Sequence, residues 1–327
     1  PAPAAEAKSV QAASSGVTDM RLELASALKI ILDKPEAHGH PRLTRALRDD
    51  IAAVYASRSY AAFWSDGQGL TDKGLRVHKH LQMAAHDGLD ATAYALPPLP
   101  AGADMAARAA YDFRLTQAVV LYARDAQGGR IDAKRLSNLI DPENDLAAPA
   151  DILAAVSDVA DPATRLAAYN PPHAGYKALR AHLILLRTAT DATGSTAATA
   201  AADVKPDESV PARRRKTAVL ATASSKAEAD IIANMERWRW LPRDLGEKHV
   251  FVNIPEYRVR VMDRGAVAHE ARVIVGKPDS PTPVFSDRMQ FLVVNPSWFV
   301  PPSIMKKEFL PRLAEDPTYA ERRGYQV

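Results

Sequence analysis

The two residues with the clearest spacing for covalent chemistry are Ser303 and Lys306, in the sequence Ser-Ile-Met-Lys. On a helix this spacing places a hydroxyl and an amine one turn apart, so that the amine can help to deprotonate the serine. The other motifs of serine acyl enzymes are missing, because no Lys-Thr-Gly occurs and Ser286-Asp287 is followed by Arg288 rather than asparagine. We therefore favour a simpler role for Ser303, as the N-cap of a helix with a lysine-rich surface.

Histidine and cysteine patterns add no second set of catalytic or metal-binding residues. His38 and His40 are two positions apart, as are His78 and His80, and residues at this spacing on a helix do not face each other. We interpret them as surface histidines, and the zinc-protease sequence His-Glu-x-x-His is absent. The cysteine count is zero, which excludes disulfides, thiolate metal sites and a cysteine nucleophile within these residues. We expect no metal and no cofactor.

Basic and aromatic residues alternate from Arg237 to Trp240. Such interleaving can bind nucleobases or sugars by stacking. More often, tryptophans in such a position anchor a helix to its own domain, and we favour this anchor role. The formal net charge of +3 and pI of about 9.0 are compatible with an anionic partner but select none. We expect no nucleic-acid partner.

Composition is that of a globular protein, with 47% hydrophobic and 25% charged residues in 327. No run approaches 18 consecutive apolar residues, so we expect no transmembrane segment in this chain. Residues 1–16 are rich in alanine, serine and proline and lack an initiator methionine. We expect this segment to be disordered and to have followed a removed export signal or anchor.

Helical periodicity dominates residues 17–188. Leu43, Leu47, Ile51 and Val54 recur every three or four positions, which places them on one face of a helix. Glycine and proline breaks separate roughly six to eight such helices, and we expect an all-α scaffold domain here. Residues 189–224 are rich in alanine, threonine and serine and contain a basic run, a composition that predicts a flexible, solvated linker.

The pattern changes to β after a helix that resumes at residue 227. Apolar residues alternate over 250–254 and 257–261, and Asp263-Arg264-Gly265 predicts a hairpin turn between strands. We expect the partner strand to contain residues 273–275, and residues 289–294 to form a strand buried on both faces. The predicted fold is α+β and multidomain, with an all-α domain followed by an incomplete, mostly-β domain.

Five ordered blocks within residues 234–304 resemble the large Gram-negative L,D-transpeptidases of the YcbB type, which have a YkuD-like catalytic domain. The blocks are Asn234-Met235-Glu236-Arg237-Trp238-Arg239-Trp240-Leu241-Pro242, Val252-Asn253-Ile254-Pro255, Val273-Ile274-Val275-Gly276-Lys277, Thr282-Pro283-Val284-Phe285-Ser286 and Asn295-Pro296-Ser297-Trp298-Phe299-Val300-Pro301-Pro302-Ser303-Ile304. Three earlier elements, Tyr60 to Trp64, Gly88-Leu89-Asp90 and Gly129-Arg130-Ile131, resemble the helical scaffold domain of the same proteins less specifically.

The resemblance implies an exported enzyme of the periplasm or cell envelope that acts on peptidoglycan stem peptides. In this family a cysteine attacks the donor peptide, releases D-alanine and passes the acyl group to an amine, which forms a 3-3 cross-link. A thiolate suits this step because it is nucleophilic near neutral pH. Carbapenems are expected to acylate the same cysteine.

The sequence departs from the family pattern in two respects. The family's Ser-His-Gly-Cys motif lies downstream of the capping segment, whereas this sequence ends at Val327 without a cysteine. A separate peptidoglycan-binding module, which many relatives carry, has no counterpart in residues 189–224. We therefore assign no catalytic residue, predict that this chain alone is inactive, and expect the missing C-terminal part of the same protein as a partner.

The resemblance divides the later chain into residues 225–298, the first part of the catalytic domain, and 299–327, the start of its capping subdomain. By their place in the last block, Asn295, Trp298, Pro301 and Ser303 are expected to border the substrate groove. The alternative is that they only fix the turn from strand to cap.

Two other functions remain open. The chain is alternatively a non-catalytic peptidoglycan-binding or scaffold protein, or else a serine acyl enzyme at Ser303.

Overall fold

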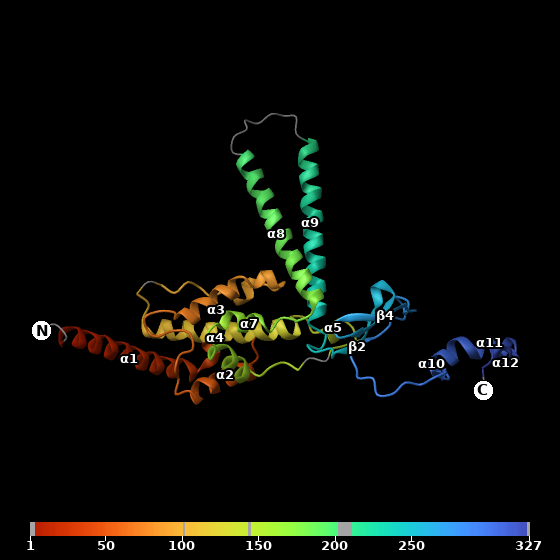
Figure 1. Ribbon diagram of the computed structural model, residues 1–327, viewed down its shortest axis with the longest axis horizontal. Coiled ribbons are helices and arrows are strands. Elements are labelled where there is room, and N and C mark those ends of the chain that lie inside the picture. Colours follow the sequence, from red (N-terminus) through yellow and green to blue (C-terminus); the bar gives the residue numbers. More distant parts are fainter. Residues whose placement is uncertain (1–3, 101, 143–144, 202–210, 326–327) are drawn as a thin grey trace. The chain divides into compact units, whose positions relative to one another are not determined.

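The computed structural model describes the backbone of residues 4–100, 102–142, 145–201 and 211–325 (Figure 1). Within these ranges, side chains are described except in residues 1–17 and 190–224. Contacts divide the chain into two compact units, Pro1–Ser286 and Asp287–Val327, and each is described by itself. No helix in the described part is both long enough and apolar enough to cross a bilayer.

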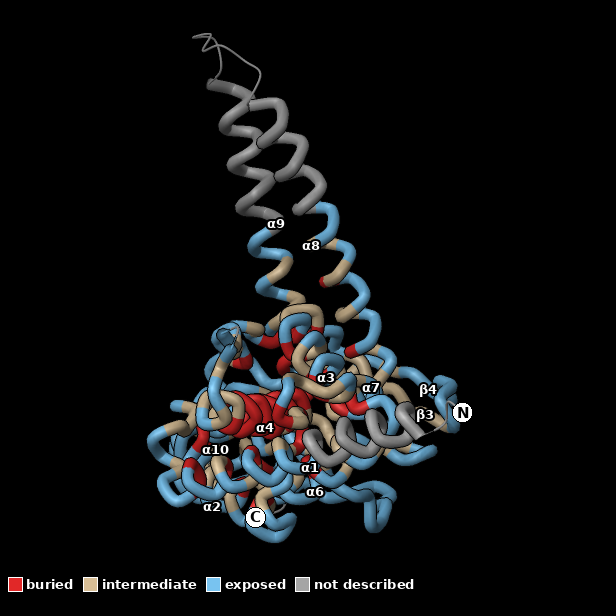
Figure 2. The backbone as a smooth tube through the Cα atoms, turned by 90° about the vertical axis from the view of Figure 1, so that its left-hand side faces the viewer, coloured by how far each residue is buried: buried red, intermediate tan, exposed pale blue. Residues whose placement is uncertain are grey.

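The core of the first unit is built around α4 (Met105–Gly128), which Figure 2 shows buried along most of its length. Phe113, Leu115, Val119 and Tyr122 are all fully buried, and together they cover more than one face, as expected for a helix surrounded by others. The helices packed against it are α1 (Ala4–Leu32), α2 (Arg45–Ser57), α3 (Asp72–Gln82), α6 (Pro149–Ser157) and α7 (Pro162–Ala167). The predicted all-α scaffold domain is confirmed.

Side-chain caps explain where several of these helices begin. Thr44 accepts a hydrogen bond from the amide of Leu47, Thr71 from Gly74, and Asp104 from Ala107. The connections contain η1 (Pro35–His38), η2 (Ala84–Asp87), η3 (Ala91–Tyr94), α5 (Ala133–Leu136) and β1 (Ile140–Asp141).

Two long helices, α8 (Ala174–Ala201) and α9 (Pro211–Trp238), run side by side (Figure 1). Their backbones extend into the segment for which we predicted a flexible linker, while residues 202–210 lie outside the described part. Likewise, α1 begins at Ala4, inside the segment predicted to be disordered, and residues 1–3 are not described. The difference has a physical reason, because alanine has the highest helix propensity of any residue and both segments are rich in it.

A three-stranded antiparallel sheet follows α9. It contains β2 (Lys248–Asn253), β3 (Arg258–Asp263) and β4 (Ala266–Arg272), joined by η4 (Ile254–Glu256) and a tight hairpin. The predicted turn is confirmed, since Arg264 and Gly265 both adopt the positive φ values, 47° and 81°, of a two-residue hairpin loop. The partner strand is not where we predicted it. Because β3 begins at Arg258, opposite Arg272, residues 273–275 lie beyond the end of the ladder, and the Val273 amide donates to the carbonyl of Tyr257 at 3.0 Å.

The prediction of a strand at residues 289–294 is wrong. These residues form no ladder, and Phe291 and Val294 are 77% and 76% exposed. An apolar strand needs hydrogen-bonding neighbours and a covering layer, and the described residues supply neither. The strand that precedes this segment in the sequence, β5 (Val284–Phe285), belongs to the first unit and pairs in parallel with β1.

The second unit ends in short helices: α10 (Pro302–Ile304), the π-helical turn η5 (Met305–Phe309), α11 (Leu310–Glu315) and α12 (Tyr319–Arg322). Phe309 is buried there against the rings of Tyr319 and Tyr325. The predicted N-cap role of Ser303 is wrong, because Pro301 is the N-cap and Pro302 occupies the first helical position, which proline favours.

Candidate functional site

The four residues expected to border a substrate groove all lie exposed in the second unit. Trp298 is 60% exposed, and Asn295 has a positive φ of 50°. The carbonyl of Pro301 accepts hydrogen bonds from the amides of Ile304 and Met305, at 3.0 and 2.9 Å, so it helps to start α10. Among the described residues, no hydrogen bond or ring contact joins Asn295, Trp298, Pro301 and Ser303 to one another. Their role in substrate binding stays a prediction.

Ser303 and Lys306 show no arrangement for acyl transfer. Both side chains are exposed, and Lys306 lies in the π-helical turn rather than one α-helical turn after the serine. In the described part of the chain, no hydrogen bond links the two side chains. The geometry therefore gives no support to a serine nucleophile at this position.

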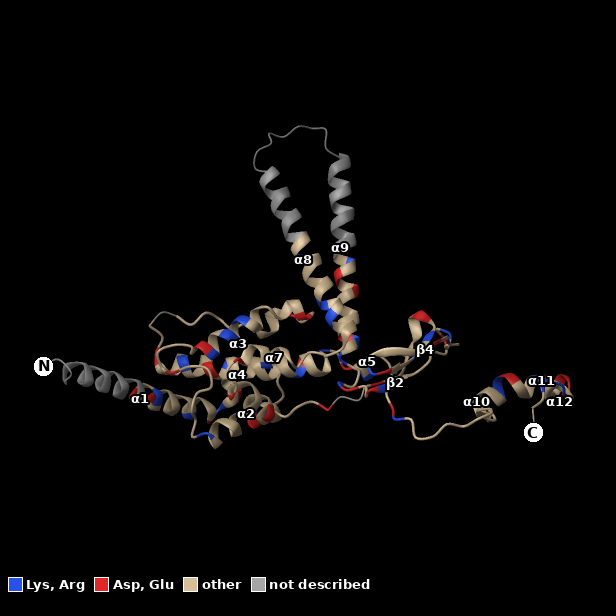
Figure 3. Cartoon of the chain, in the orientation of Figure 1, with Lys and Arg blue, Asp and Glu red and all other residues tan. Residues whose placement is uncertain are grey.

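Among the described residues, no group of three histidine, aspartate or glutamate side chains is placed to hold a metal ion. The interpretation of His80 as a surface residue is wrong, since its Nε2 lies 2.9 Å from the hydroxyl of buried Tyr122, and burial lowers the pKa of the imidazole. Figure 3 shows acidic and basic residues mixed along helices such as α3 and α9.

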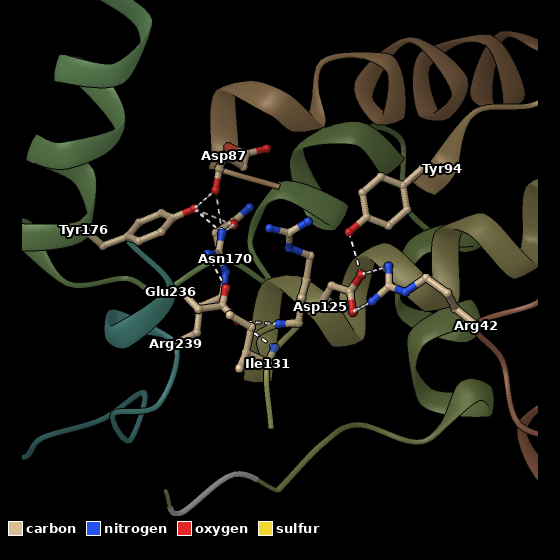
Figure 4. A network of polar contacts seen from close by, with 10 residues as sticks. Arg42, Asp87, Tyr94, Asp125, Ile131, Asn170, Tyr176, Glu236 and Arg239 are labelled. Atoms are coloured by element: carbon tan, nitrogen blue, oxygen red, sulfur yellow. Dashed lines mark hydrogen bonds and ion pairs between the residues drawn. The ribbon is translucent and has the colours of Figure 1, made fainter. Parts of the chain in front are cut away.

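Buried polar groups from several parts of the chain meet where α9 ends, around residues 235–243, which we call the joint segment. At its centre is Arg239, whose side chain is fully buried. Its Nη2 donates to the carbonyl of Asp87 and to the hydroxyl of Tyr176, while Nη1 forms an ion pair of 3.3 Å with Glu236 (Figure 4). A fully buried guanidinium requires such partners, because an unpaired one would be strongly destabilising.

Glu236 connects the joint segment to a second part of the scaffold. Its Oε1 accepts hydrogen bonds from the backbone amides of Arg130 and Ile131, at 2.5 and 2.9 Å (Figure 4). Gly129 makes this approach possible: it has a φ of 87°, and a Cβ there would lie 2.6 Å from Glu236 Oε1. The Gly129-Arg130-Ile131 element of the sequence thus binds the Glu236 carboxylate.

Asp87, at the end of η2, joins these contacts to the scaffold core. Its Oδ1 accepts from Arg180 Nε at 2.6 Å and its Oδ2 from the Tyr122 hydroxyl at 2.7 Å, while its carbonyl accepts from Tyr176. Burial raises the pKa of both tyrosines, so they remain protonated donors.

Trp238 lies between the scaffold and the sheet. Its ring centroid is 5.3 Å from His173, which precedes α8, and 6.2 Å from Phe251 of β2, to which it is nearly parallel. Met235 is fully buried against Tyr176 and Leu183. The predicted role of the tryptophans, as an anchor of a helix to its own domain, is therefore confirmed for Trp238.

Arg243 completes the joint segment. Its guanidinium donates to the carbonyls of Tyr169, Ala168 and Asn170, at 2.7, 2.6 and 3.2 Å, just after α7 ends. Sequence reasoning missed the roles of Glu236, Arg239 and Arg243. A usable signal was present, since an arginine on the inward face of an amphipathic helix end needs a buried partner.

Chemically, this network is structural. Nη1 and Nη2 of Arg239 and the carboxylates of Asp87 and Glu236 contact protein atoms, whereas Arg239 Nε is buried without a hydrogen-bond partner. Among the described residues, no acid and base face each other across an open space in this network. Two further buried carboxylates have the same character. Asp112 accepts from the amides of Phe63 and Trp64, and Asp125 receives the paired guanidinium nitrogens of Arg42 at 2.8 and 2.9 Å.

Comparison with known proteins agrees with this division of the chain. Residues 49–183 match the family model of the Scaffold domain, and residues 247–327 match that of the L,D-transpeptidase catalytic domain, YkuD. One chain thus combines a Scaffold domain match with an L,D-transpeptidase catalytic domain match. A putative L,D-transpeptidase of Haemophilus influenzae is 35% identical to it over 94 residues, which cover 29% of this chain and 19% of that protein. The chain thus matches about a fifth of the length of its relative.

The two matched regions lie on either side of the joint segment. Residues 235–243 lie between the end of the scaffold match at residue 183 and the start of the catalytic match at residue 247. The buried scaffold core is larger than its match, since Leu24 and Leu28 of α1 belong to it.

Proposed function

We propose that this chain is the scaffold domain and the first strands of a peptidoglycan L,D-transpeptidase of the cell envelope. The observation that carries the proposal is the match of residues 247–327 to the L,D-transpeptidase catalytic domain. In the proposed reaction a cysteine thiolate attacks the acyl-donor stem peptide and D-alanine leaves, which gives a thioester. An acceptor amine then attacks the thioester carbonyl, the carbon–sulfur bond breaks, and the cysteine is regenerated as the 3-3 cross-link forms. The 327 residues contain no cysteine, so the nucleophile belongs to a further part of the protein.

Exposed apolar surface in the catalytic region supports a further, covering part. Val250 and Val252 of β2 are each 47% exposed, and residues 291–294 are more so. A sheet of three strands with an open edge strand, β4, is a template for additional pairing. The further C-terminal part of the same protein is the proposed occupant of this surface.

Peptidoglycan stem peptides are the proposed substrate, and Asn295, Trp298, Pro301 and Ser303 are proposed to border their groove. The exposed Trp298 ring offers an apolar wall, and Asn295 and Ser303 offer hydrogen-bonding groups to a peptide. A periplasmic location and acylation of the cysteine by carbapenems follow from the same proposal.

The test compares this 327-residue chain with a longer chain that includes the cysteine. Each is incubated with a carbapenem or with a stem tetrapeptide, and intact mass and released D-alanine are measured. We expect an adduct and D-alanine from the longer chain only, with both lost when its cysteine is replaced by alanine.

Two outcomes would contradict the proposal. The first is a longer chain that sediments with peptidoglycan yet forms no adduct. This result would favour the alternative function, a non-catalytic peptidoglycan-binding protein, which the absence of cysteine from these 327 residues supports. An adduct on the 327-residue chain that disappears in Ser303→Ala would establish a serine acyl enzyme instead.

A further inference from the structure

The joint segment begins in the last turn of α9, is separated from β2 by residues 244–247, and contacts the scaffold through several of its side chains. We propose that it is a positioning element, which holds β2 and its sheet in one orientation relative to the scaffold domain. In this role its side chains act through the sheet rather than on a substrate. The inference goes beyond the proposed transpeptidase activity and does not depend on it.

Arg239 supplies the polar part of this positioning. Its guanidinium contacts Asp87, Asn170 and Tyr176, which come from three separate parts of the scaffold region: the end of η2, the loop after α7, and α8. All three acceptors lie within hydrogen-bond distance of Nη2, and Nη1 pairs with Glu236. The planar guanidinium is therefore held through both of its terminal nitrogens, which restricts its rotation as well as its position. The hydrogen bonds that Glu236 accepts from Arg130 and Ile131 add a fourth attachment on the opposite side of the ion pair.

Trp238 supplies the apolar part, because one ring contacts both sides of the connection. His173 belongs to the scaffold side and Phe251 to β2, and both rings lie close to that of Trp238. Gly175, at the start of α8, leaves space for this ring, since a Cβ there would lie 2.2 Å from Trp238 Cζ2. Any larger residue at position 175 must therefore displace the tryptophan.

Contacts at both ends of the segment limit movement further. Gly88, with a φ of 71°, lies against Met235, and Arg243 binds three consecutive carbonyls after α7. Arg237 differs from its neighbours, because it is exposed and its described hydrogen bond goes only to Asn234, on the same helix. It offers a matched control for Arg239.

The absence of cysteine allows a direct measurement of orientation. Lys79→Cys on α3 and His269→Cys on β4, both at exposed positions, introduce two thiols for spin labels, and the distance distribution between the labels is measured by double electron–electron resonance. The doubly labelled chain should give one narrow distribution. Gly175→Ala, which removes no polar contact, and Arg239→Met should each broaden it at least about twofold.

Matched variants separate positioning from general damage. Gly69→Ala, where a Cβ would meet nothing within 4 Å, and Arg237→Met should both keep the narrow distribution. Far-UV circular dichroism shows whether the scaffold remains folded in each variant, and if Arg239→Met does not fold, Gly175→Ala decides.

Three results would overturn the inference. The first is a broad distribution in the parent chain. The second is an unchanged, narrow distribution in a folded Gly175→Ala variant. The third is loss of the helical signal in both Gly175→Ala and Arg239→Met, because the segment would then serve scaffold folding and not orientation.

Discussion

At the scale of single residues, the scaffold depends on buried carboxylates that receive several donors each. Asp112 is fully buried and accepts hydrogen bonds from the Tyr55 and Ser65 hydroxyls and from the amides of Phe63 and Trp64. Burial raises the pKa of this carboxyl, and the four hydrogen bonds oppose that effect by stabilising the anion. Because Asp112 belongs to α4, these hydrogen bonds attach the aromatic block from Tyr60 to Trp64 to that helix.

Replacing Asp112 by asparagine should lower the free energy of unfolding by about 3 kcal/mol, because an amide cannot accept all four hydrogen bonds and leaves buried donors unpaired. Urea unfolding followed by circular dichroism measures the change. Asp49→Asn is the control, since Asp49 is exposed in an ion pair with Arg45 and should cost less than about 0.5 kcal/mol. Equal effects of the two substitutions on the free energy of unfolding would contradict the role of Asp112 as a buried acceptor of four hydrogen bonds.

Four partly buried histidines, His40, His78, His80 and His173, predict how stability depends on pH. Burial lowers the folded-state pKa of His80 below its ordinary value of 6.5, so the unfolded chain binds more protons as pH falls through 6.5. The stability that neutral His80 contributes is therefore present above pH 6.5 and is lost as pH falls below it. The pKa values of His40, His78 and His173 are also lowered by burial, and they should act in the same direction.

The variant His80→Gln should consequently lose less stability than the parent chain between about pH 7 and about pH 5.5. Urea unfolding at the two pH values gives the comparison. His182→Gln, at an exposed position on α8, should lose as much as the parent. A parent-like loss in His80→Gln would mean that this imidazole is not responsible.

At the scale of elements, an apolar segment forms a strand in this structure only where a partner strand lies beside it. Apolar residues alternate over 250–254 and 257–261, and β2 and β3 form there with slightly different bounds, whereas the more apolar residues 289–294 remain unpaired. Alternation shows that a segment suits one side of a sheet, but the partner strand must exist in space. Sequence pattern alone cannot supply it.

The exposure of residues 289–294 has a measurable consequence. Leu292→Ala should change the stability of this chain by no more than about 0.5 kcal/mol, because Leu292 is 77% exposed. The same substitution at Leu183, which is fully buried at the base of α8, should cost roughly 2–5 kcal/mol. Chemical denaturation of both variants tests this, and a large cost at Leu292 would show that the segment is covered in solution.

At the scale of the whole molecule, the scaffold does not end where its helical pattern and family match end. Asp87, Tyr176 and the amides of Arg130 and Ile131 are satisfied by Arg239 and Glu236, more than fifty residues beyond residue 183. The predicted boundary at residue 188 therefore separates groups that depend on each other.

Two fragments that both retain α8 and most of α9 test this boundary. Residues 18–244 include the joint segment, and residues 18–233 stop before it. We expect the shorter fragment to melt about 5 °C lower or more, because loss of the buried network should cost at least about 2 kcal/mol. Differential scanning calorimetry measures both, and identical melting temperatures would place the boundary before the joint segment.

The sequence by itself determined the division into a helical and a β part, the two-residue turn at Arg264 and Gly265, and the family. These depend on local periodicity, turn conformation and ordered blocks of residues, all of which are readable along one chain. The long helices in the alanine-rich segments also depend on a local property, the high helix propensity of alanine. Our predictions of a disordered terminus and a flexible linker did not take this propensity into account.

Only the tertiary structure decided which residues meet. Nothing in the spacing of Asp87, Gly129, Asn170 and Arg239 indicates that they share one buried network, because burial of a charge becomes favourable only once partners from distant segments are assembled around it. The same holds for Gly175, whose missing side chain matters only because Trp238 occupies that space.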